Sequence, residues 1–328
     1  MANSILNNND KFLEVRGLKK HFKTKKGLLH AVDDINFDII KGETLGLVGE
    51  SGCGKSTTGR LLIRLLEATE GQVLLKGQDV LKYNNRQMKD FRRNAQIVFQ
   101  DPYSCLNPRW TVSEIISEPL KVNGLYRNDS KGMEKRITEL METVGIADRL
   151  FDAYPHELDG GRRQRVGIAR ALALNPEFIV MDEPVSALDV CIQAQILNLL
   201  KELQKEFDLT YLFIAHNLSV VKHVSDRIAV MYLGKIVEIT DYRSIFKNPV
   251  HPYTQALLSA IPVPKIDVER KPIILEGDVP SPINPPSGCR FAQRCVYCKD
   301  ICKVENPELR AVKTGHSVAC HFAEQFVK

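Results

Sequence analysis

The chain has 328 residues, of which 44% are hydrophobic and 26% are charged, and its formal net charge is +5. This length and composition predict about two globular domains, with ample apolar material for a core. Because the charge is small and no basic block stands out, we expect no nucleic-acid partner.

The N-terminal stretch MANSILNNNDKF is polar and lacks the apolar segment of a signal peptide. No run of residues approaches the ~20 apolar residues that cross a bilayer. We therefore expect a cytoplasmic protein, and peripheral attachment to a membrane protein remains open. In such a compartment the eight cysteines favour thiols or metal ligands over disulfides. Five of them crowd into residues 289–320.

Apolar runs typical of strands alternate along the chain with segments of helical periodicity. Strands that alternate with helices predict an α/β domain with a mostly parallel sheet. The expected strands lie at residues 12–16, 29–39, 44–48, 71–77, 95–100, 178–183, 210–216 and 226–233.

Helical patterns predict a helix from about Lys55 to Leu66, two amphipathic helices at 112–122 and 133–144, and another helix at 193–207. The two amphipathic helices belong to an expected helical insertion at about residues 105–175. Beyond about residue 263 the chain becomes richer in proline and cysteine, which indicates a linker and a small appended lobe. The predicted domains are therefore residues 12–262 and 263–328.

The motif GESGCGKS at residues 49–56 follows the strand TLGLV and precedes a helix. This is the G-x-x-x-x-G-K-S pattern, in which glycines let backbone N–H groups wrap phosphate oxygens. Lys55 would reach the outer phosphates, and the Ser56 hydroxyl would bind Mg²⁺. The flanking strand and helix argue against a chance glycine-rich loop. The nucleotide-binding candidates are Gly49, Glu50, Ser51, Gly52, Cys53, Gly54, Lys55, Ser56 and Thr57.

Two acidic residues end the apolar strand FIVMDE. Asp182 is suited to hold Mg²⁺, as the second acid-bearing strand does in nucleotide hydrolases. Glu183 points the other way along the strand and could polarise a water for attack on the terminal phosphorus. Alone, the pair would fit an exposed strand end equally well, but the phosphate loop favours the catalytic interpretation.

Three further residues fit a set that senses the γ-phosphate of ATP. Gln100 and His216 each end a predicted strand, and Asp189 closes SALD just after Glu183. Gln100 is also a candidate Mg²⁺ ligand. Taken alone, each of these side chains would more often be a solvent-exposed polar group without a catalytic role. Their order along the chain supports the phosphate-sensing role.

The chain closely resembles the ATPase subunits of ABC transporters. GESGCGKS, Gln100, the LDGGRRQR turn, MDEP, SALD and His216 occur in the order and spacing of that family over roughly residues 12–240. The resemblance implies a P-loop ATPase sheet, an antiparallel β subdomain and an inserted helical subdomain. It also implies a head-to-tail dimer, in which each ATP lies between one phosphate loop and the signature turn of the other chain. By the same resemblance, Phe22 is the aromatic residue that stacks on adenine.

Two segments point to one group within this family, the dipeptide and oligopeptide importers, whose ATPases they resemble. They are NPVHPYTQALLSAIP (248–262) and SPINPPSGCRFAQRC (281–295). Within that group the chain is closest to the second of two non-identical ATPase subunits. Nickel importers share much of this pattern. The implied partners are the other, non-identical ATPase subunit, two transmembrane permeases and an extracytoplasmic solute-binding protein, which would place the chain at the cytoplasmic face of the plasma membrane.

The signature turn departs from the Leu-Ser-Gly-Gly-Gln of the family, since it reads Leu158, Asp159, Gly160, Gly161, Arg162. The anionic Asp159 replaces the serine that would donate a hydrogen bond to the γ-phosphate. Two like charges about 4 Å apart, such as this carboxylate and the phosphate, repel by ~1 kcal/mol in water and ~4 kcal/mol at an effective dielectric constant near 20. Asp159 could instead pair with Arg162, three positions along the helix, and present a nearly neutral face. A weakened composite site is the preferred hypothesis, and a compensated site is the alternative.

The clustered cysteines have the spacing C-x5-C-x2-C-x3-C-x17-C, which matches no common zinc ribbon. Four thiolates can hold tetrahedral Zn²⁺ or an iron–sulfur cluster. Similar peptide-importer ATPases carry a [4Fe–4S] cluster in this tail, and the resemblance assigns it here, with zinc and then free thiols as the alternatives. The matching residues are Cys289, Cys295, Cys302 and Cys320, and Cys298 is an extra thiol.

We therefore predict an ATPase that drives import of di- or oligopeptides, or of nickel or another small solute, through separate membrane subunits. A soluble ABC ATPase acting on nucleic acid or ribosomes is the rival from another class, but neither tandem ATPase domains nor heptad insertions are present. A non-catalytic nucleotide-binding subunit is disfavoured by the intact Glu183 and His216.

Overall fold

The computed structural model describes residues 11–261, 272–278 and 280–327. The chain forms two compact units, which we call unit 1 (Met1–Lys82 and Phe213–Lys328) and unit 2 (Tyr83–Leu212). The predicted domain boundary between residues 262 and 263 lies outside the described residues. Within the described ranges, no helix has both the length and the hydropathy that membrane crossing requires.

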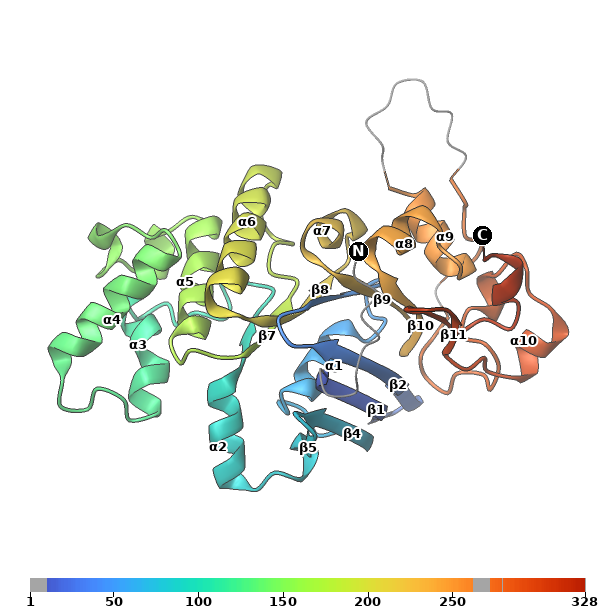
Figure 1. Ribbon diagram of the computed structural model, residues 1–328, viewed down its shortest axis with the longest axis horizontal. Coiled ribbons are helices and arrows are strands. Elements are labelled where there is room, and N and C mark those ends of the chain that lie inside the picture. Colours follow the sequence, from blue (N-terminus) through green and yellow to red (C-terminus); the bar gives the residue numbers. More distant parts are fainter. Residues whose placement is uncertain (1–10, 262–271, 279, 328) are drawn as a thin grey trace. The chain divides into compact units, whose positions relative to one another are not determined.

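Unit 1 contains an antiparallel sheet with the strand order β2-β1-β4-β5 (Figure 1). Strands β1 (Lys11–Thr24) and β2 (Gly27–Ile40) form a hairpin that continues well beyond the apolar segments predicted as strands, with Phe22 opposite Leu29. The outer part of this hairpin is polar, so hydrophobic alternation could not reveal it. Strands β4 (Glu70–Leu75) and β5 (Gln78–Asp79) and a 3-10 turn at Val80–Lys82 complete this layer.

The other sheet of unit 1 has the order β11-β12-β10-β9-β3. Its strands are β3 (Thr44–Val48), β9 (Arg227–Tyr232), β10 (Lys235–Asp241), β11 (Arg310–Lys313) and β12 (His316–Val318). Strands β3 and β9 pair in parallel, whereas the pairs β9–β10, β10–β12 and β11–β12 are antiparallel. The sheet is therefore mixed, because β10, β12 and β11 add antiparallel strands beyond β9, which the expectation of a mostly parallel sheet did not include.

Five helices of unit 1 belong to the described residues: α1 (Lys55–Leu62), α7 (Leu218–Val224), α8 (Tyr242–Lys247), α9 (Pro252–Ser259) and α10 (Asp300–Val304). Strand β8 (Thr210–Ala215) carries the chain from unit 2 back into unit 1. Helix α1 ends earlier than predicted because Arg64 takes a left-handed conformation with φ 50°, which a continuing helix excludes.

The described part of unit 2 contains the parallel strands β6 (Ala95–Val98) and β7 (Phe178–Asp182) and a group of helices (Figure 1, cyan to yellow). Helix α3 begins at a capping box, in which Thr111 and Glu114 each satisfy a backbone N–H of the other. The helices are α2 (Asn85–Asn94), α3 (Val112–Val122), α4 (Ser130–Thr143), α5 (Gly160–Leu172) and α6 (Val190–Phe207).

The tail after residue 280 is attached to the strands of unit 1 by backbone hydrogen bonds. The N–H of His30 donates to Pro282 O at 3.0 Å, and the N–H of Asn284 donates to Leu28 O at 2.9 Å. The fully buried carboxylate of Glu238 on β10 lies 2.7 Å from Nε2 of His316 in the tail. The tail thus shares its packing and its hydrogen bonds with the core of unit 1.

Candidate nucleotide-binding and catalytic site

The phosphate loop connects the buried strand β3 to helix α1, as predicted. Gly54 takes the position before the helix with φ 109°, a conformation that L side chains rarely adopt. A Cβ atom there would also lie only 2.1 Å from Ala31 O. Glycine is therefore required, and the helix N-terminus is left open toward an anion.

Lys55, at the start of α1, is buried, and its ammonium group lies against the loop. Its Nζ donates hydrogen bonds to Gly49 O at 2.9 Å and to Glu50 O at 3.0 Å. The positive charge is therefore already held where phosphate oxygens would arrive and compete for it. Cys53 is buried beside this lysine, and burial raises the pKa of its thiol, so it contributes its backbone and its packing to the loop.

Phe22, the predicted adenine-stacking residue, lies near the tip of the β1–β2 hairpin in unit 1. Its ring is half-buried, and the Nζ of Lys20 lies 4.9 Å from the ring centroid. A cation above one ring face is a favourable contact with the aromatic quadrupole. An aromatic ring with an adjacent cation suits a nucleotide, which offers a base to stack and phosphates to attract.

In unit 2, two of the predicted catalytic residues contact each other. The Nε2 of Gln100 donates a hydrogen bond of 2.9 Å to Oε2 of Glu183. Glu183 follows Asp182, which ends β7 and is 1% exposed. The φ angle of Glu183 is 48°. A non-glycine residue in the left-handed region is uncommon and often marks a functional position. Gln100 lies two residues beyond β6, which ends at Val98, so its predicted place at the strand end is wrong.

The remaining predicted phosphate sensors lie at the ends of elements. His216 directly follows β8 and is exposed. Asp189 is the N-cap of α6, where its Oδ1 accepts a hydrogen bond of 3.0 Å from the N–H of Ile192. Asp189 therefore has a structural role in addition to the role expected from its motif.

The signature turn opens helix α5, and Asp159 is its N-cap. Oδ1 of Asp159 accepts a hydrogen bond of 2.7 Å from the backbone N–H of Arg162, and its Oδ2 lies 3.5 Å from Nε of Arg162. The acidic residue is thus stabilised by the helix N-terminus and by a cation of its own turn. This geometry favours the compensated alternative over the weakened site. Gly160 and Gly161 begin the helix, and a Cβ on Gly161 would lie 2.6 Å from the Ile192 side chain.

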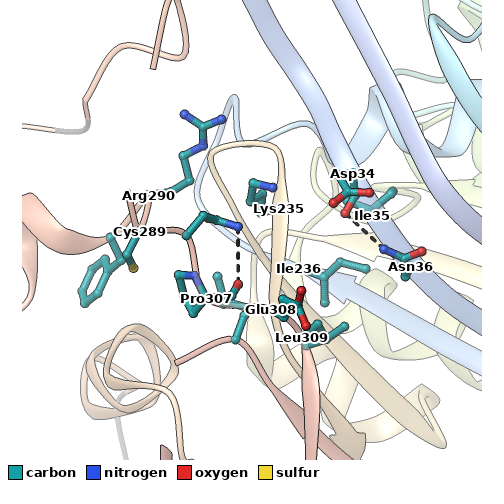
Figure 2. A pocket seen from close by; sticks show the side chains of 14 residues that line it. Asp34, Ile35, Asn36, Lys235, Ile236, Cys289, Arg290, Pro307, Glu308 and Leu309 are labelled. Atoms are coloured by element: carbon teal, nitrogen blue, oxygen red, sulfur yellow. Dashed lines mark hydrogen bonds between the residues drawn. The ribbon is translucent and has the colours of Figure 1, made fainter. Parts of the chain in front are cut away.

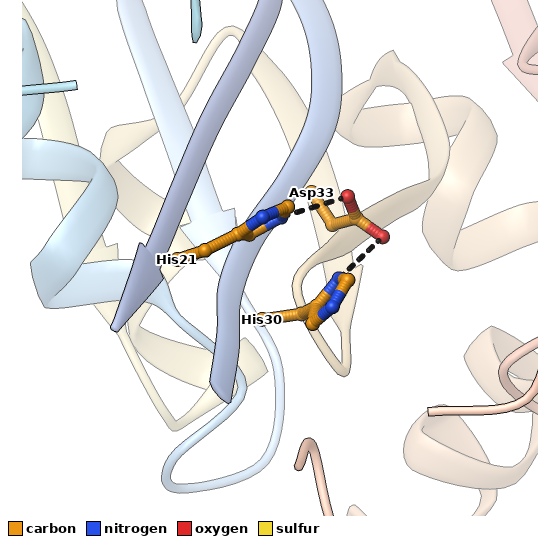
Figure 3. A group of neighbouring side chains, drawn as sticks. All are labelled: His21, His30 and Asp33. Atoms are coloured by element: carbon orange, nitrogen blue, oxygen red, sulfur yellow. Dashed lines mark hydrogen bonds and ion pairs between the residues drawn. The ribbon is translucent and has the colours of Figure 1, made fainter. Parts of the chain in front are cut away.

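A group that the sequence did not reveal lies on the β1–β2 hairpin (Figure 3). Nε2 of His21 and Nδ1 of His30 lie 3.2 and 3.4 Å from the two carboxylate oxygens of Asp33. Among the described residues, this is the one set of three His, Cys, Asp or Glu ligand atoms within 4.8 Å of one another. Nη2 of Arg290 and Nζ of Lys235 also approach Asp33, at 2.5 and 3.9 Å. These cations already compensate the carboxylate, so the group suits a charge network better than a metal site.

The same network shifts pKa values. Burial opposes ionisation of Asp33, but Lys235 and the hydrogen bonds from Arg290 and His21 outweigh it and lower the pKa of Asp33 to about 2. Burial and the neighbouring His21 lower the pKa of His30, so its ring favours the neutral form. Only the contact partners in three dimensions reveal this arrangement, since Arg290 lies 257 positions from Asp33 in the sequence.

A pocket of about 280 Å³ lies in unit 1 between the β2 and β10 strands and the tail (Figure 2). Its lining carries both signs of charge, from Asp34, Lys235, Arg290 and Glu308. None of the predicted nucleotide-binding residues lines it, and of the predicted cysteines only Cys289 does. The pocket is therefore separate from the phosphate loop.

Four of the five clustered cysteines line one small apolar cavity: Cys289, Cys295, Cys302 and Cys320. These are the four that the resemblance assigned to a cluster, and the extra thiol, Cys298, is not in the lining. Burial raises the pKa of Cys289 to about 12 and that of Cys295 to about 11. Thiolates in this cavity would therefore need a cation to stabilise them.

The sulfurs of these cysteines are not gathered as closely as the ligands of a bound zinc ion would be. In the described part of the chain, which includes all eight cysteines, no three of the sulfurs lie within 4.8 Å of one another. Zn–S bonds of about 2.3 Å in a tetrahedron would bring the sulfurs to roughly 3.8 Å from one another. No three of the described sulfurs therefore have the mutual spacing of ligands in a tetrahedral zinc site.

The phosphate loop, the Gln100–Glu183 pair and the glycine turn that opens α5 define an ATP-binding cassette of the ABC transporter class. Residues 32–186 match the family model described as ABC transporter. Two solved structures share the fold at 29% identity. The dimeric bacterial ABC transporter cassette MJ0796 has a TM-score of 0.65 over 70% of this chain and 99% of that chain. The cbiO1 component of an ABC transporter complex from Clostridium perfringens has a TM-score of 0.64 over 74% and 93%.

Residues 237–302 match the family model described as the C-terminal region of oligopeptide/dipeptide transporters. The chain is 52% identical to the oligopeptide transport ATP-binding protein AppF of Bacillus subtilis (strain 168), over 96% of this chain and 98% of that protein. It is 53% identical to OppF of the same organism, with the same coverage. The chain belongs to the ABC transporter ATP-binding proteins of the oligopeptide/dipeptide importer family, and it is an ATPase.

Proposed function

We propose that this chain hydrolyses ATP to power the import of di- or oligopeptides through a separate membrane permease. The observation that carries the proposal is the similarity over nearly the whole chain to oligopeptide transport ATP-binding proteins, including the peptide-transporter C-terminal region at residues 237–302. The partners would be two permease subunits, a solute-binding protein and a second, non-identical ATPase, and the chain would act at the cytoplasmic face of the membrane.

On the phosphate side of the site, we propose that Lys55 binds the outer phosphates and that Ser56, Asp182 and Gln100 hold Mg²⁺. The open N-terminus of α1 and the ammonium group held at the loop support this assignment. When bound, Mg²⁺ would spread negative charge away from the γ-phosphate. The Phe22 ring would stack on the adenine.

For the chemical step, we propose that Glu183 orients and polarises the attacking water, with His216 steadying the transferred phosphoryl group. The Gln100 amide, which donates to the Glu183 carboxylate, would fix the direction of that carboxylate. Asp159, Gly160, Gly161, Arg162 and Asp189 would contribute to the composite site that contains the phosphate loop of the partner ATPase.

We propose further that Cys289, Cys295, Cys302 and Cys320 hold a [4Fe–4S] cluster. Their common cavity supports a shared metal centre, and the resemblance to peptide-importer ATPases favours the cluster over Zn²⁺. The centre would brace a tail segment that is too small to bury a core of its own.

The test of peptide import is uptake of a labelled tripeptide by proteoliposomes that contain the assembled transporter and internal ATP. We expect uptake with the wild-type chain and a loss of at least one hundredfold with Glu183→Gln. A complex that hydrolyses ATP but transports no peptide, or that takes up Ni²⁺ instead, would contradict the proposed cargo while leaving the ATPase assignment intact.

A further inference from the structure

The tail of the chain contacts the phosphate loop directly. Arg294 follows Phe291 within the cysteine-rich tail, and its Nη1 donates hydrogen bonds of 3.1 and 2.9 Å to the two carboxylate oxygens of Glu50. Glu50 is the second residue of the G-x-x-x-x-G-K-S loop, 244 positions earlier in the sequence. Both residues belong to unit 1.

The ion pair is well shielded from water. The side chain of Arg294 is 9% exposed and that of Glu50 is 25% exposed. Shielding strengthens the attraction between the charges, and it makes the loss of either partner more costly than at a surface. The contact therefore differs from the exposed pairs elsewhere in the tail, such as Arg310 with Glu324.

Glu50 is held at its backbone as well as at its side chain. Its N–H donates a hydrogen bond of 3.0 Å to the hydroxyl of Tyr253 on α9, and its carbonyl accepts one from Lys55. The Tyr253 hydroxyl group is thus an acceptor that fixes one of the loop N–H groups. Contacts at three points define the conformation of this residue within the loop.

Arg294 and Tyr253 are both tied to an aromatic cluster, since the N–H of Arg294 donates a hydrogen bond of 3.0 Å to Phe291 O and the Tyr253 ring belongs to the cluster. The Phe291 ring lies 5.3 Å from the Tyr232 ring and 5.5 Å from the Tyr253 ring, centroid to centroid. All three side chains are almost completely buried. Buried aromatic rings in such contact resist reorientation, so the guanidinium group meets Glu50 with a fixed geometry.

We infer that Arg294 is a positioning residue for the phosphate loop, through which the tail of this chain sets its own affinity for ATP. Arg294 neutralises the Glu50 carboxylate close to the place where a polyphosphate binds, and with Tyr253 it holds the loop in one conformation. This inference rests on the role proposed for the loop in binding ATP and is independent of the transported cargo.

The test is equilibrium binding of a fluorescent ATP analogue to the purified full-length chain, compared among wild type, Arg294→Met, Glu50→Gln and the double variant. Arg294→Met leaves an uncompensated carboxylate beside the phosphates, and we expect the dissociation constant to rise about tenfold. Glu50→Gln in the same chain removes that carboxylate, so the double variant should recover most of the affinity. Arg294→Lys should recover part of it, because the charge remains.

Arg310→Met is the matched control, since it removes an arginine of the same tail whose partner Glu324 is exposed. Thermal unfolding and the iron and zinc content of each variant report whether the tail is intact. In the assembled ATPase, Arg294→Met should raise KM for ATP with little change in kcat, which is the pattern of lost uniform binding.

Wild-type affinity in Arg294→Met, or a double variant that binds no better than Arg294→Met, would overturn the inference. Equal losses in Arg294→Met and Arg310→Met would indicate general damage to the tail and would overturn it as well. A wild-type chain that binds no ATP would instead overturn the proposed function, so the two failures are distinguishable.

Discussion

Arg162 contacts Asp159 twice in the signature turn, by a hydrogen bond of 2.7 Å from its backbone N–H and by an ion pair of its guanidinium Nε at 3.5 Å. The two side chains that set this turn apart from the Leu-Ser-Gly-Gly-Gln pattern therefore form an ion pair with each other. Both side chains are about half exposed, so the ion pair itself contributes little to stability. Its effect concerns the charge that the turn presents to a triphosphate.

If Arg162 compensates the charge of Asp159, replacing Arg162 alone should reduce ATPase activity. We expect Arg162→Gln to lower the ATPase rate of the assembled complex by about tenfold, because Asp159 would then face the γ-phosphate uncompensated. Asp159→Ser combined with Arg162→Gln restores the usual turn and should remain within about twofold of wild type. Steady-state hydrolysis checks both variants, and a large gain in the double variant would support a weakened natural site instead.

Glu183→Gln should abolish turnover and preserve nucleotide binding. The amide keeps the shape of the side chain but cannot polarise water, so we expect kcat to fall by about 10²–10⁴ while ATP stays trapped in the complex. The Glu183 carboxylate accepts from Gln100, which makes Gln100→Glu an informative companion, since it sets two acids side by side. Single-turnover hydrolysis and nucleotide trapping are the measurements. Unchanged hydrolysis by Glu183→Gln would remove this residue from the mechanism.

Asp33 should stabilise unit 1 in a pH-dependent way. Its pKa is lowered to about 2 in the folded chain, so its contribution is present above the unfolded pKa near 4 and is lost as the pH falls toward 2. Asp33→Asn should cost about 2 kcal/mol at pH 7. The gap in unfolding free energy between variant and wild type should narrow below about pH 4.

Unfolding curves between pH 7 and pH 3 test this expectation, with Asp34→Asn as the exposed control at the next position. A gap that stays constant over this range would show that the cost comes from packing and not from charge.

The cysteines should separate into two classes on substitution. Cys302→Ser removes one of the four thiols around the common cavity and should reduce bound iron and acid-labile sulfide severalfold. Cys298→Ser is the matched control, because its sulfur lies outside that lining, and it should leave the metal content unchanged. Elemental analysis of anaerobically purified protein measures both. A colourless wild-type protein with one zinc ion would contradict the [4Fe–4S] assignment.

The sequence predicted the parts of the structure that carry strong local signals. The strand at Thr44–Val48 and the helix at Val112–Val122 have the predicted bounds, since an apolar run before a glycine loop and an amphipathic period are both local patterns. The conformation of the phosphate loop likewise follows from its glycines. Gln100 and Glu183 were expected in one site from their order along the chain, and the structure places them in contact.

What the sequence could not predict depends on contacts between distant segments. Arg294 and Glu50 carry no motif that links them, and neither do Arg290 and Asp33. The short strands β11 and β12 are too brief and too polar for a periodicity to emerge, and they form because β10 offers an edge for pairing. Tertiary pairing here overrides weak local preference.

The position of Phe291 has a practical consequence for work on the isolated cassette. Tyr232 and Tyr253 each have 0% of their surface exposed, and Phe291 from the tail covers part of both rings. In a protein truncated before residue 280, these two rings would be exposed to solvent as a hydrophobic surface. Such a surface promotes aggregation. Truncation to a minimal cassette is therefore expected to reduce the yield of dispersed, monomeric material.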